Sequence, residues 1–206
     1  VLNADADSFD QMIANRLEPE IYSFRSLADF ADAVSHAGET RYPVHIKLDT
    51  GMHRLGFMEE EIGRLCEVLP TLPAVKVASV FSHLNCADMP EEDAYTRAQI
   101  ALFDRMSARV AASLPYPVIR HTANSAAIER FPEAQFDMCR LGLGLYGFGW
   151  EHNAGLRPVS ALKTRIVQIK RLPAGDAVGY GRAGKLTRPT TTATIPIGYA
   201  DGLDRH

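Results

Sequence analysis

The stretch that decides the fold is residues 44–57, VHIKLDTGMHRLGF. Its first half alternates apolar with ionisable side chains, which are Val44, Ile46 and Leu48 against His45, Lys47 and Asp49. Successive side chains of a strand point to opposite faces, so one face of this strand is apolar and the other is ionisable. A glycine-containing turn and a basic run, Asp49-Thr50-Gly51 and Met52-His53-Arg54, follow at once. The pattern therefore predicts a strand that ends where loops gather.

Such a two-faced strand fits a barrel of parallel strands covered by helices. In that fold the apolar face packs against the helices, and the other face lines the barrel interior. Lys47 is then buried. An isolated buried ammonium is costly, so the sequence predicts that Lys47 is paired, neutralised or chemically modified.

Around this strand the chain alternates strand-like and helix-like segments. Strands are expected at residues 1–3, 20–24, 75–82, 118–120 and 137–141, and helices at 8–17, 26–34, 59–69, 90–114 and near 126–127. Ser26 is the expected N-cap of the second helix. Repeated strand–helix units indicate a parallel sheet, and their number favours an α/β fold of the (β/α)8 or TIM barrel type over residues 1–154.

The pattern changes after Trp150. Apolar and polar residues alternate from 156 to 172, and further strand-like segments follow at 175–181 and 191–196 without a helical stretch between them. We therefore expect a second, mostly β domain at residues 155–206, unfinished at its end. The chain opens on Val1 without an initiator methionine, and we expect it to be part of a longer protein.

Composition narrows the function classes. The 206 residues are 46% hydrophobic and carry a net charge of −3 without basic runs, which argues against a nucleic-acid or membrane surface. No apolar run approaches the roughly 20 residues of a membrane span, and no signal peptide is visible. Cys66, Cys86 and Cys139 lack paired or metal-type spacing. We expect reduced thiols in a cytoplasmic protein without a metal site.

Polar and basic residues gather at the expected strand ends, where barrel enzymes build their active sites. In chain order they are Lys47, Arg54, His83, His121, Asn124, Ser125, Arg140 and Gly142. Each of these residues is weak evidence for an active site when taken alone. A histidine at a strand end, for example, is more often packed and hydrogen-bonded than catalytic. Several such polar or basic clusters on one face make a stronger case.

Two local patterns suggest binding groups. Ser125 near a helix start, with Gly142 and Gly144 after a strand, resembles a phosphate cup of backbone N–H groups, although glycines serve ordinary turns equally well. Tyr180 stands between Gly179 and Gly181. A tight turn would aim this tyrosine outward, but taken alone it is also a simple hairpin tyrosine.

A series of motifs resembles the alanine racemase family. The motifs are Lys47-Leu-Asp-Thr-Gly51 to Arg54-Leu-Gly56, Ser82-His83-Leu84, His121-Thr-Ala-Asn-Ser125 with Arg140-Leu-Gly142, Val178-Gly-Tyr180-Gly181 and Pro196-Ile-Gly-Tyr199-Ala-Asp-Gly202. They occur in family order and span essentially the whole chain, so the series is far more specific than any single motif. Met52-His53-Arg54 resembles the variant found in racemases fused to the cell-wall tripeptide:D-alanyl-D-alanine ligase.

The resemblance implies an isomerase of fold type III that uses pyridoxal 5'-phosphate. Such an enzyme interconverts L-alanine and D-alanine by a two-base mechanism and supplies D-alanine for peptidoglycan of the cell wall. It implies a cytoplasmic homodimer whose active site is shared between subunits. It also implies that this chain is an incomplete barrel, whose first strands are absent, followed by the start of the C-terminal β domain.

The resemblance assigns cofactor-binding roles. Arg140 matches the arginine that faces the pyridine nitrogen, and His121 matches the histidine that supports it. His83 corresponds to the residue stacked against the ring and linked toward the catalytic tyrosine. Ser125, with the backbone of Gly142 and Leu143, matches the phosphate site.

Other roles concern the substrate. Lys47 matches the lysine that many members carbamylate, and the resulting anion pairs with Arg54, which addresses the cofactor hydroxyl and the substrate carboxylate. Tyr180 matches the general base on the L face, and Tyr199 matches a tyrosine at the substrate entry. The second subunit contributes both tyrosines.

One family residue has no match. The Schiff-base lysine of the family ends the first barrel strand, ahead of Val1, and the lysines present sit in other contexts. We therefore expect this chain alone to be inactive.

Two other classes remain open. A barrel that binds pyridoxal phosphate without racemase activity shares the phosphate cup but lacks the β domain and its tyrosines. A metal-dependent barrel hydrolase would use a carbamylated Lys47 with His45, His83 and His121 as metal ligands. It would usually need an early paired-histidine motif, and none is visible.

Overall fold

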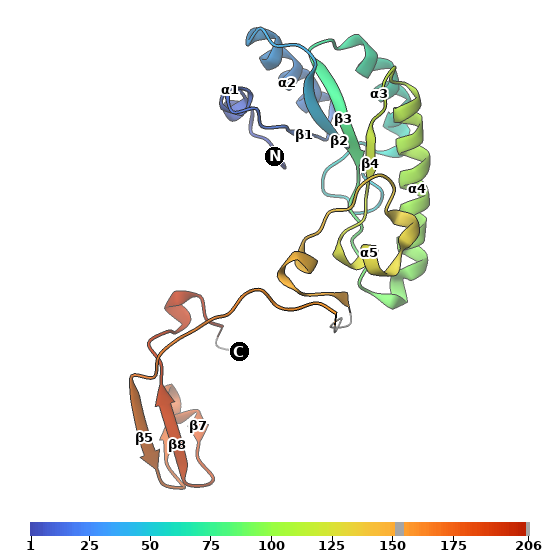
Figure 1. Ribbon diagram of the computed structural model, residues 1–206. Coiled ribbons are helices and arrows are strands. Elements are labelled where there is room, and N and C mark those ends of the chain that lie inside the picture. The colour runs from blue at the N-terminus through green and yellow to red at the C-terminus, as the bar shows by residue number, and fades with distance from the viewer. Residues whose placement is uncertain (151–154, 205–206) are drawn as a thin grey trace. The chain divides into compact units, whose positions relative to one another are not determined.

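The computed structural model describes residues 1–150 and 155–204, and it divides the chain into two units, Val1–Pro158 and Val159–His206 (Figure 1). The expected domain boundary between residues 154 and 155 adjoins residues 151–154, which lie outside the described residues. That boundary stays a prediction.

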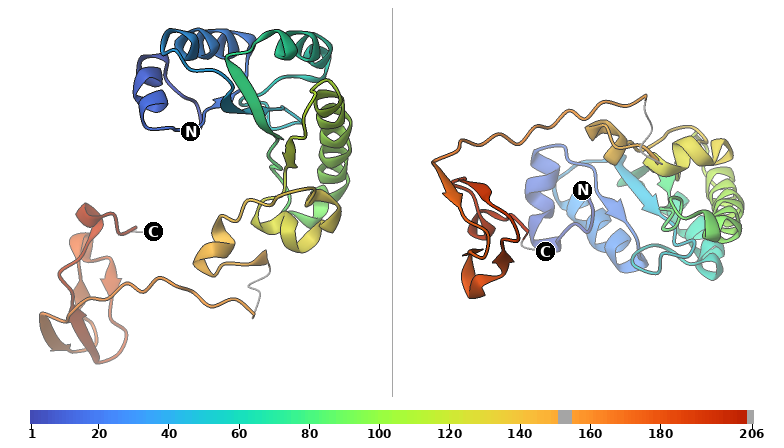
Figure 2. Two further views of the ribbon diagram at one scale, coloured as in Figure 1. Left: turned by 45° about the horizontal axis from the view of Figure 1, so that its top comes forward. Right: turned by 90° about the horizontal axis from the view of Figure 1, so that it is seen from below.

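The first unit is built on a four-stranded parallel sheet in the order β1-β2-β3-β4. Its strands are β1 (Glu20–Ile21), β2 (Tyr42–Lys47), β3 (Val75–Phe81) and β4 (Ile119–His121). Strands that are neighbours in the sheet are also consecutive in sequence, with a helix in each connection, as in a (β/α) barrel. Figure 2 shows the strands on the inner side of a curved layer of helices. This α/β arrangement confirms the predicted fold class.

The helices follow the expected order; α1, α3 and α4 are shorter than predicted, whereas α2 and α5 are longer. They are α1 (Phe9–Ala14), α2 (Phe24–His36), α3 (Ile62–Val68), α4 (Asp93–Ala112) and α5 (Ser125–Arg130). The expected N-cap Ser26 is wrong, because α2 begins earlier, after Ser23. The Ser23 hydroxyl accepts from the Ser26 N–H, and the Ser26 hydroxyl accepts from the Ser23 N–H. This reciprocal pair satisfies two backbone donors at once, which favours the earlier start.

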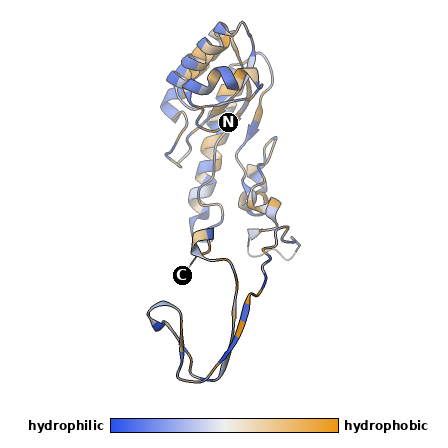
Figure 3. Ribbon diagram, turned by 90° about the vertical axis from the view of Figure 1, so that its left-hand side faces the viewer, coloured by the Kyte–Doolittle hydropathy of each residue, from blue (hydrophilic) through white to orange (hydrophobic). Residues whose placement is uncertain are grey.

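The apolar face of β2 packs into the main core, as predicted. Val44, Ile46 and Leu48 are each 0% exposed. Phe30 of α2 and Phe103 of α4 belong to the same cluster. Figure 3 shows hydrophilic and hydrophobic residues alternating along the helices of this unit, as expected of helices with one buried side. The opposite, ionisable face of β2 is thereby directed to the inner side of the sheet.

A β-bulge in β3 changes which of its residues share that inner face. Val44 lies opposite Val77, but the next residue of β2, His45, lies opposite Ser79. One residue of β3 is therefore extra, and the alternation of its side chains shifts beyond this point. Val77 and Val80 are both buried in the core, while Ser79 and Phe81 stand opposite His45 and Lys47.

Three expected strands differ from the structure. Residues 1–3 form no strand, although the Val1 carbonyl accepts from the Glu20 N–H. Residues 137–141 form no ladder, because only two backbone bonds join them to the β4 segment, from the Asp137 N–H to the Arg120 carbonyl and from the Arg140 N–H to the Ala123 carbonyl. Of the strand expected at 156–172, the part from residue 168 onward forms, because that part finds a partner strand.

The second unit contains short antiparallel pairs, in agreement with the predicted β character. Strand β5 (Gln168–Leu172) pairs with β8 (Thr190–Thr194), and β6 (Ala177–Val178) pairs with β7 (Gly184–Lys185). The 3-10 turns Tyr180–Arg182 and Tyr199–Asp201 follow β6 and β8. Across the described parts of both units, no helix combines the length and the apolar character that a membrane crossing requires.

Candidate active site

The loop after β2 is held in place by the Asp49 carboxylate. One of its oxygens accepts from the N–H groups of Gly51 and His53, at 2.9 and 3.0 Å. The loop then returns to the strand, where Phe57 bonds to Lys47 and Asp49 through the backbone. Gly56 is required at this return. Its φ is +132°, and a Cβ there would lie 2.6 Å from the Asp49 nitrogen.

Lys47 is buried at the end of β2, with 6% of its surface exposed. Its ammonium lies 4.5 Å from the centroid of the Phe81 ring. Among the described residues no carboxylate forms an ion pair with it. Burial lowers the pKa of Lys47; Glu20 opposes this effect, while the Arg140 and Arg54 charges add to it. The predicted burial of Lys47 is confirmed, and burial disfavours the charged form of its side chain.

Arg140 is the centre of the polar cluster, although it lies in a segment without regular structure. Its Nη1 donates to His121 Nδ1 at 2.7 Å. Its Nη2 donates to the Ser82 carbonyl at 2.7 Å and approaches His83 Nδ1 at 3.2 Å. The structure therefore brings together three site residues that were predicted from sequence. They are His121 of β4, His83 of the segment after β3 and Arg140 of the segment after β4.

The protonation states of both histidines follow from this geometry. A guanidinium only donates hydrogen bonds, so each Nδ1 must be bare and the neutral ring carries its proton on Nε2. Burial and the Arg140 charge lower the pKa of His83 to about 4 and that of His121 to about 3. Burial lowers the pKa of Arg140 to about 10, which leaves it charged at neutral pH. The cluster is one permanent cation held by two neutral rings.

A backbone cup lies beside this cluster. The Ser125 hydroxyl oxygen accepts from the N–H groups of Gly142 and Gly144, at 3.0 and 3.1 Å. The resemblance implies that the backbone of Leu143 also holds the phosphate, and that role stays a prediction. Asn124 caps α5 by accepting from the Ala127 N–H at 3.1 Å, which sets the helix start and Ser125 with it.

A cleft of about 390 Å³ joins the cup to the cluster. Its lining includes most of the predicted cofactor-binding residues, namely His83, Ser125, Arg140, Gly142 and Leu143. Arg54 and Lys47 are not part of this lining. Arg54 is an exposed residue of the loop after β2, and its charge is close enough to lower the pKa of His83.

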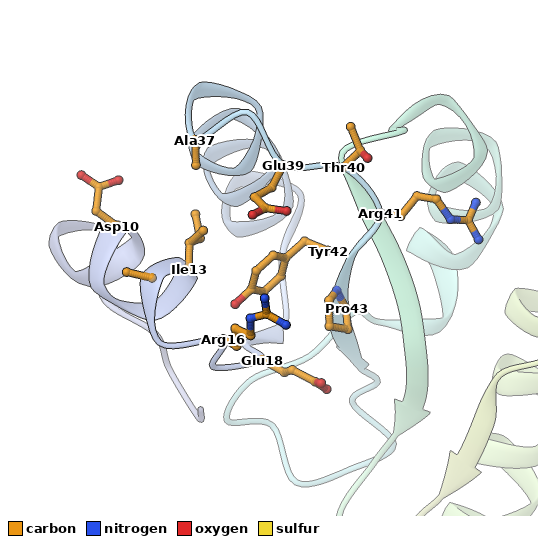
Figure 4. Close-up of a pocket in the computed structure, with 11 residues that line it drawn as sticks. Asp10, Ile13, Arg16, Glu18, Ala37, Glu39, Thr40, Arg41, Tyr42 and Pro43 are labelled. Atoms are coloured by element: carbon orange, nitrogen blue, oxygen red, sulfur yellow. The ribbon is translucent and has the colours of Figure 1, made fainter.

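A larger cleft of the first unit lies elsewhere. It has a volume of about 840 Å³ and lies between α1, α2 and the start of β2, with Arg16 beside the Tyr42 ring and Glu18 at its edge (Figure 4). None of the site residues predicted from sequence lines it. It opens at the amino end of β2, whereas barrel chemistry is built at the carboxyl ends of strands. Volume is therefore a poor guide to the active site here.

The two predicted tyrosines belong to the second unit. Tyr180 follows the short strand β6, flanked by Gly179 and Gly181 with φ of +82° and +64°, and its side chain is 86% exposed. Tyr199 begins a 3-10 turn and is 63% exposed. The outward aim expected for Tyr180 agrees with this exposure. Their roles at the site stay predictions.

Sequence reasoning missed two residues of the site, Phe81 and Ser79. The His121 ring stacks on Phe81 with a centroid distance of 5.0 Å, and the Ser79 hydroxyl bonds to His121 Nε2 at 3.0 Å. Both residues sit in an apolar strand that was read as one uninterrupted element. The available signal was Ser79 itself, a polar residue between buried valines.

The histidines do not form a metal site within the described residues. No group of three or more histidine, cysteine, aspartate or glutamate side chains converges there. His83 and His121 both turn Nδ1 toward Arg140, and a permanent cation repels a metal ion. The geometry therefore gives the hydrolase alternative no support.

Comparison with known proteins gives a consistent result. Residues 1–149 match the family described as alanine racemase, N-terminal domain, and residues 159–206 match alanine racemase, C-terminal domain. A curated alanine racemase of Sorangium cellulosum is 36% identical over 203 residues, which cover 97% of this chain and 53% of that protein. One from Symbiobacterium thermophilum is 42% identical over 166 residues, covering 79% of this chain and 44% of the relative.

Solved structures agree with these matches. Alanine racemase of Clostridium difficile 630 superposes with a TM-score of 0.85 at 32% identity, covering 99% of this chain and 55% of that one. Alanine racemase of Bartonella henselae, solved with covalently bound pyridoxal phosphate, gives a TM-score of 0.80 at 28% identity, covering 100% and 56%. The chain spans about half the length of the relatives that it matches.

Proposed function

The chain belongs to the alanine racemase family, and on that premise we propose that the protein interconverts L-alanine and D-alanine with pyridoxal 5'-phosphate, supplying D-alanine for peptidoglycan. The observation that carries the proposal is the Arg140 guanidinium, held by two bare histidine nitrogens beside the cleft.

The residues of the cleft fit this cofactor. The N–H groups of Gly142 and Gly144 converge on one oxygen, that of Ser125, which is the donor pattern that receives a phosphate oxygen. When bound, the cofactor supplies a ring that delocalises the negative charge left by removal of the substrate α-proton. Ser125, Gly142 and the backbone around Leu143 and Gly144 would hold its phosphate.

Arg140 would face the pyridine nitrogen. Among the described residues its Nε–H has no acceptor, while its Nη groups are engaged by His121, His83 and carbonyl oxygens. The Nε–H of Arg140 is therefore left to donate to the pyridine nitrogen of the cofactor. Because the guanidinium stays charged and only donates, this contact would keep the pyridine nitrogen unprotonated. His83, with its proton on Nε2, would lie against the ring and link toward the catalytic tyrosine.

Lys47 would be present as its carbamate. A buried amine without a carboxylate partner has a lowered pKa, and its neutral nitrogen can add to carbon dioxide. A nitrogen–carbon bond forms, one proton leaves, and the product is an anion. That anion would be attracted to Arg54, which would then bind the cofactor hydroxyl and the carboxylate of alanine.

Tyr180 would remove the α-proton on the L face, and Tyr199 would stand at the substrate entry. Both would come from the second subunit of a homodimer, within a C-terminal β domain that begins at residue 155. Their exposure, 86% and 63%, suits groups that serve another chain. The relatives are about twice as long, and the lysine that attaches the cofactor would lie in the part of them that this chain does not match. These 206 residues alone would then be inactive.

The test is a racemisation assay after addition of pyridoxal phosphate. It is made on the full-length protein and not on these 206 residues alone. L-alanine should give D-alanine, and Arg140→Ala should remove most of the activity while the phosphate cup still binds. Cofactor binding without conversion of alanine would favour the alternative, a barrel that carries the cofactor for another purpose. Activity that depended on an added metal ion, and not on the cofactor, would favour the hydrolase.

A further inference from the structure

A continuous line of hydrogen bonds runs across the inner face of the sheet, from Arg140 to the Glu18 carboxylate. Arg140 Nη1 lies 2.7 Å from His121 Nδ1, and His121 Nε2 lies 3.0 Å from the Ser79 oxygen. The Ser79 oxygen lies 2.6 Å from His45 Nδ1, and His45 Nε2 lies 2.7 Å from Glu18 Oε2. Strands β2, β3 and β4, the segment before β1 and the irregular segment that carries Arg140 contribute these groups.

The protons of this line have one consistent order when both rings are neutral. Arg140 has no acceptor atom, so His121 Nδ1 must accept and His121 Nε2–H must donate to Ser79. The Ser79 hydroxyl then donates to His45 Nδ1. His45 Nε2–H is left to donate to the Glu18 carboxylate. Every donor therefore points from the guanidinium toward the carboxylate.

With a protonated His45, fewer hydrogen-bonding groups of the line would be satisfied. Both of its nitrogens would donate, so the Ser79 oxygen would accept from His45 and from His121. The Ser79 hydroxyl proton would then need another acceptor, and the described residues offer none. Ser79 is 2% exposed, and a buried donor without a partner is costly. The neutral order satisfies all members of the line.

The fold brings these groups within hydrogen-bonding distance of one another. The bulge in β3 sets Ser79 opposite His45, and without that shift its hydroxyl would face the core. Ser79 and His121 are buried, whereas the side chains of His45 and Glu18 are 31% and 44% exposed. Glu18 stands at the edge of the large cleft at the amino end of β2 (Figure 4). The line thus connects the two ends of the sheet.

We propose that Glu18, His45 and Ser79 are positioning residues for Arg140. They hold His121 in the tautomer with a bare Nδ1, and this acceptor orients the guanidinium toward the cleft. Because hydrogen bonds in series polarise one another, the Glu18 charge also strengthens His121 Nδ1 as an acceptor. The role of Arg140 at the cofactor rests on the proposed function, whereas the order of the protons does not.

The experiment uses NMR of isotope-labelled histidine in the intact protein, without added cofactor. At neutral pH both His45 and His121 should show a protonated Nε2 and a bare Nδ1. Glu18→Gln keeps an acceptor oxygen but removes the charge. It should shift the ring nitrogens of His121 as well as those of His45. In a Ser79→Ala background, the same change should shift His45 only, since the line is cut.

A second readout follows turnover. Glu18→Gln should lower kcat for alanine by roughly tenfold with an unchanged KM, a factor typical of one charge-assisted hydrogen bond. Ser79→Thr, which retains a hydroxyl, should restore the His121 signature that Ser79→Ala loses. Glu133→Gln, which removes an exposed carboxylate paired with Arg97, is the matched control and should change neither readout.

The outcomes separate the two proposals. If Glu18→Gln shifted His45 alone and left both His121 and kcat unchanged, the line would end at His45 and the inference would be wrong. A His121 carrying its proton on Nδ1 would overturn it as well. Absence of racemase activity would refute the proposed function, while the NMR comparison would still decide the inference.

Discussion

The imidazole of His121 lies flat on the ring of Phe81, with the two planes 7° apart and their centroids separated by 5.0 Å. The same ring carries the Lys47 ammonium at 4.5 Å and the Arg140 guanidinium at 5.4 Å from its centroid. One apolar side chain therefore separates the Lys47 nitrogen, the Arg140 guanidinium and a neutral histidine. A cation is attracted to the face of an aromatic ring, which lowers the cost of burying the Arg140 charge here.

Replacement of Phe81 should therefore affect both stability and the cluster. Phe81→Leu removes the stacked face, so the free energy of unfolding should fall by about 1 to 3 kcal/mol. Cofactor affinity should fall with it, because His121 loses the surface that fixes its ring. Denaturant unfolding and a cofactor titration measure the two effects. Phe148→Leu, at an exposed phenylalanine, is the control, and an equal loss there would show that Phe81 has no special role.

Stability should depend on pH through the buried histidines. The folded pKa values of His83 and His121, about 4 and about 3, lie below the ordinary value of 6.5. Between pH 6.5 and these lower values, the unfolded chain binds more protons than the folded one. The free energy of unfolding should therefore fall as the pH drops from 6.5 toward 4.

His121→Asn should flatten this pH dependence, which denaturant unfolding at a series of pH values can measure. His36→Asn provides the comparison, because His36 is exposed and lies on the helix surface of α2. A slope that was the same in wild type and in His121→Asn would mean that His121 is not neutral in the folded protein.

The backbone cup can be tested by removing its oxygen. Ser125→Ala should weaken pyridoxal phosphate binding by roughly tenfold, because two backbone N–H groups lose their shared partner and the hydroxyl is lost to the phosphate. Absorbance titration gives the dissociation constant. Ser113→Ala, at the end of α4 where the hydroxyl bonds to the Val110 carbonyl, should leave the constant unchanged. Equal effects of the two changes would place the phosphate elsewhere.

Tyr180→Phe tests the proposed base. The change removes only the phenolic oxygen, so cofactor binding should persist while exchange of the L-alanine α-proton with solvent falls by about 10² to 10⁴. Deuterium exchange followed by NMR measures it. Tyr22→Phe, at a tyrosine that bonds to Asn3 in the first unit, serves as control. Normal exchange in Tyr180→Phe would exclude it as the base.

Much of the fold could be read from the sequence because the relevant signals are local. The alternation from Val44 to Asp49 marked one buried apolar face and placed Lys47 on the inner face, and its burial followed from that. The chemistry-bearing residues His83, His121 and Arg140 were found because they follow strand segments. Carboxyl ends of parallel strands meet at one edge, so residues far apart in sequence were expected together.

Only the tertiary structure decided the inner arrangement of the site. The bulge in β3 moves Ser79 and Phe81 to the ionisable face, and alternation along the sequence does not show where in a strand such a shift of one residue occurs. Arg140 was expected to end a strand but lies in an irregular segment, held by side chains and carbonyls of other strands. The direction of the hydrogen bonds from Arg140 to Glu18 likewise depends on distances between strands. Periodicity specifies which face a residue occupies, whereas contacts across strands depend on register, and register is a property of the folded sheet.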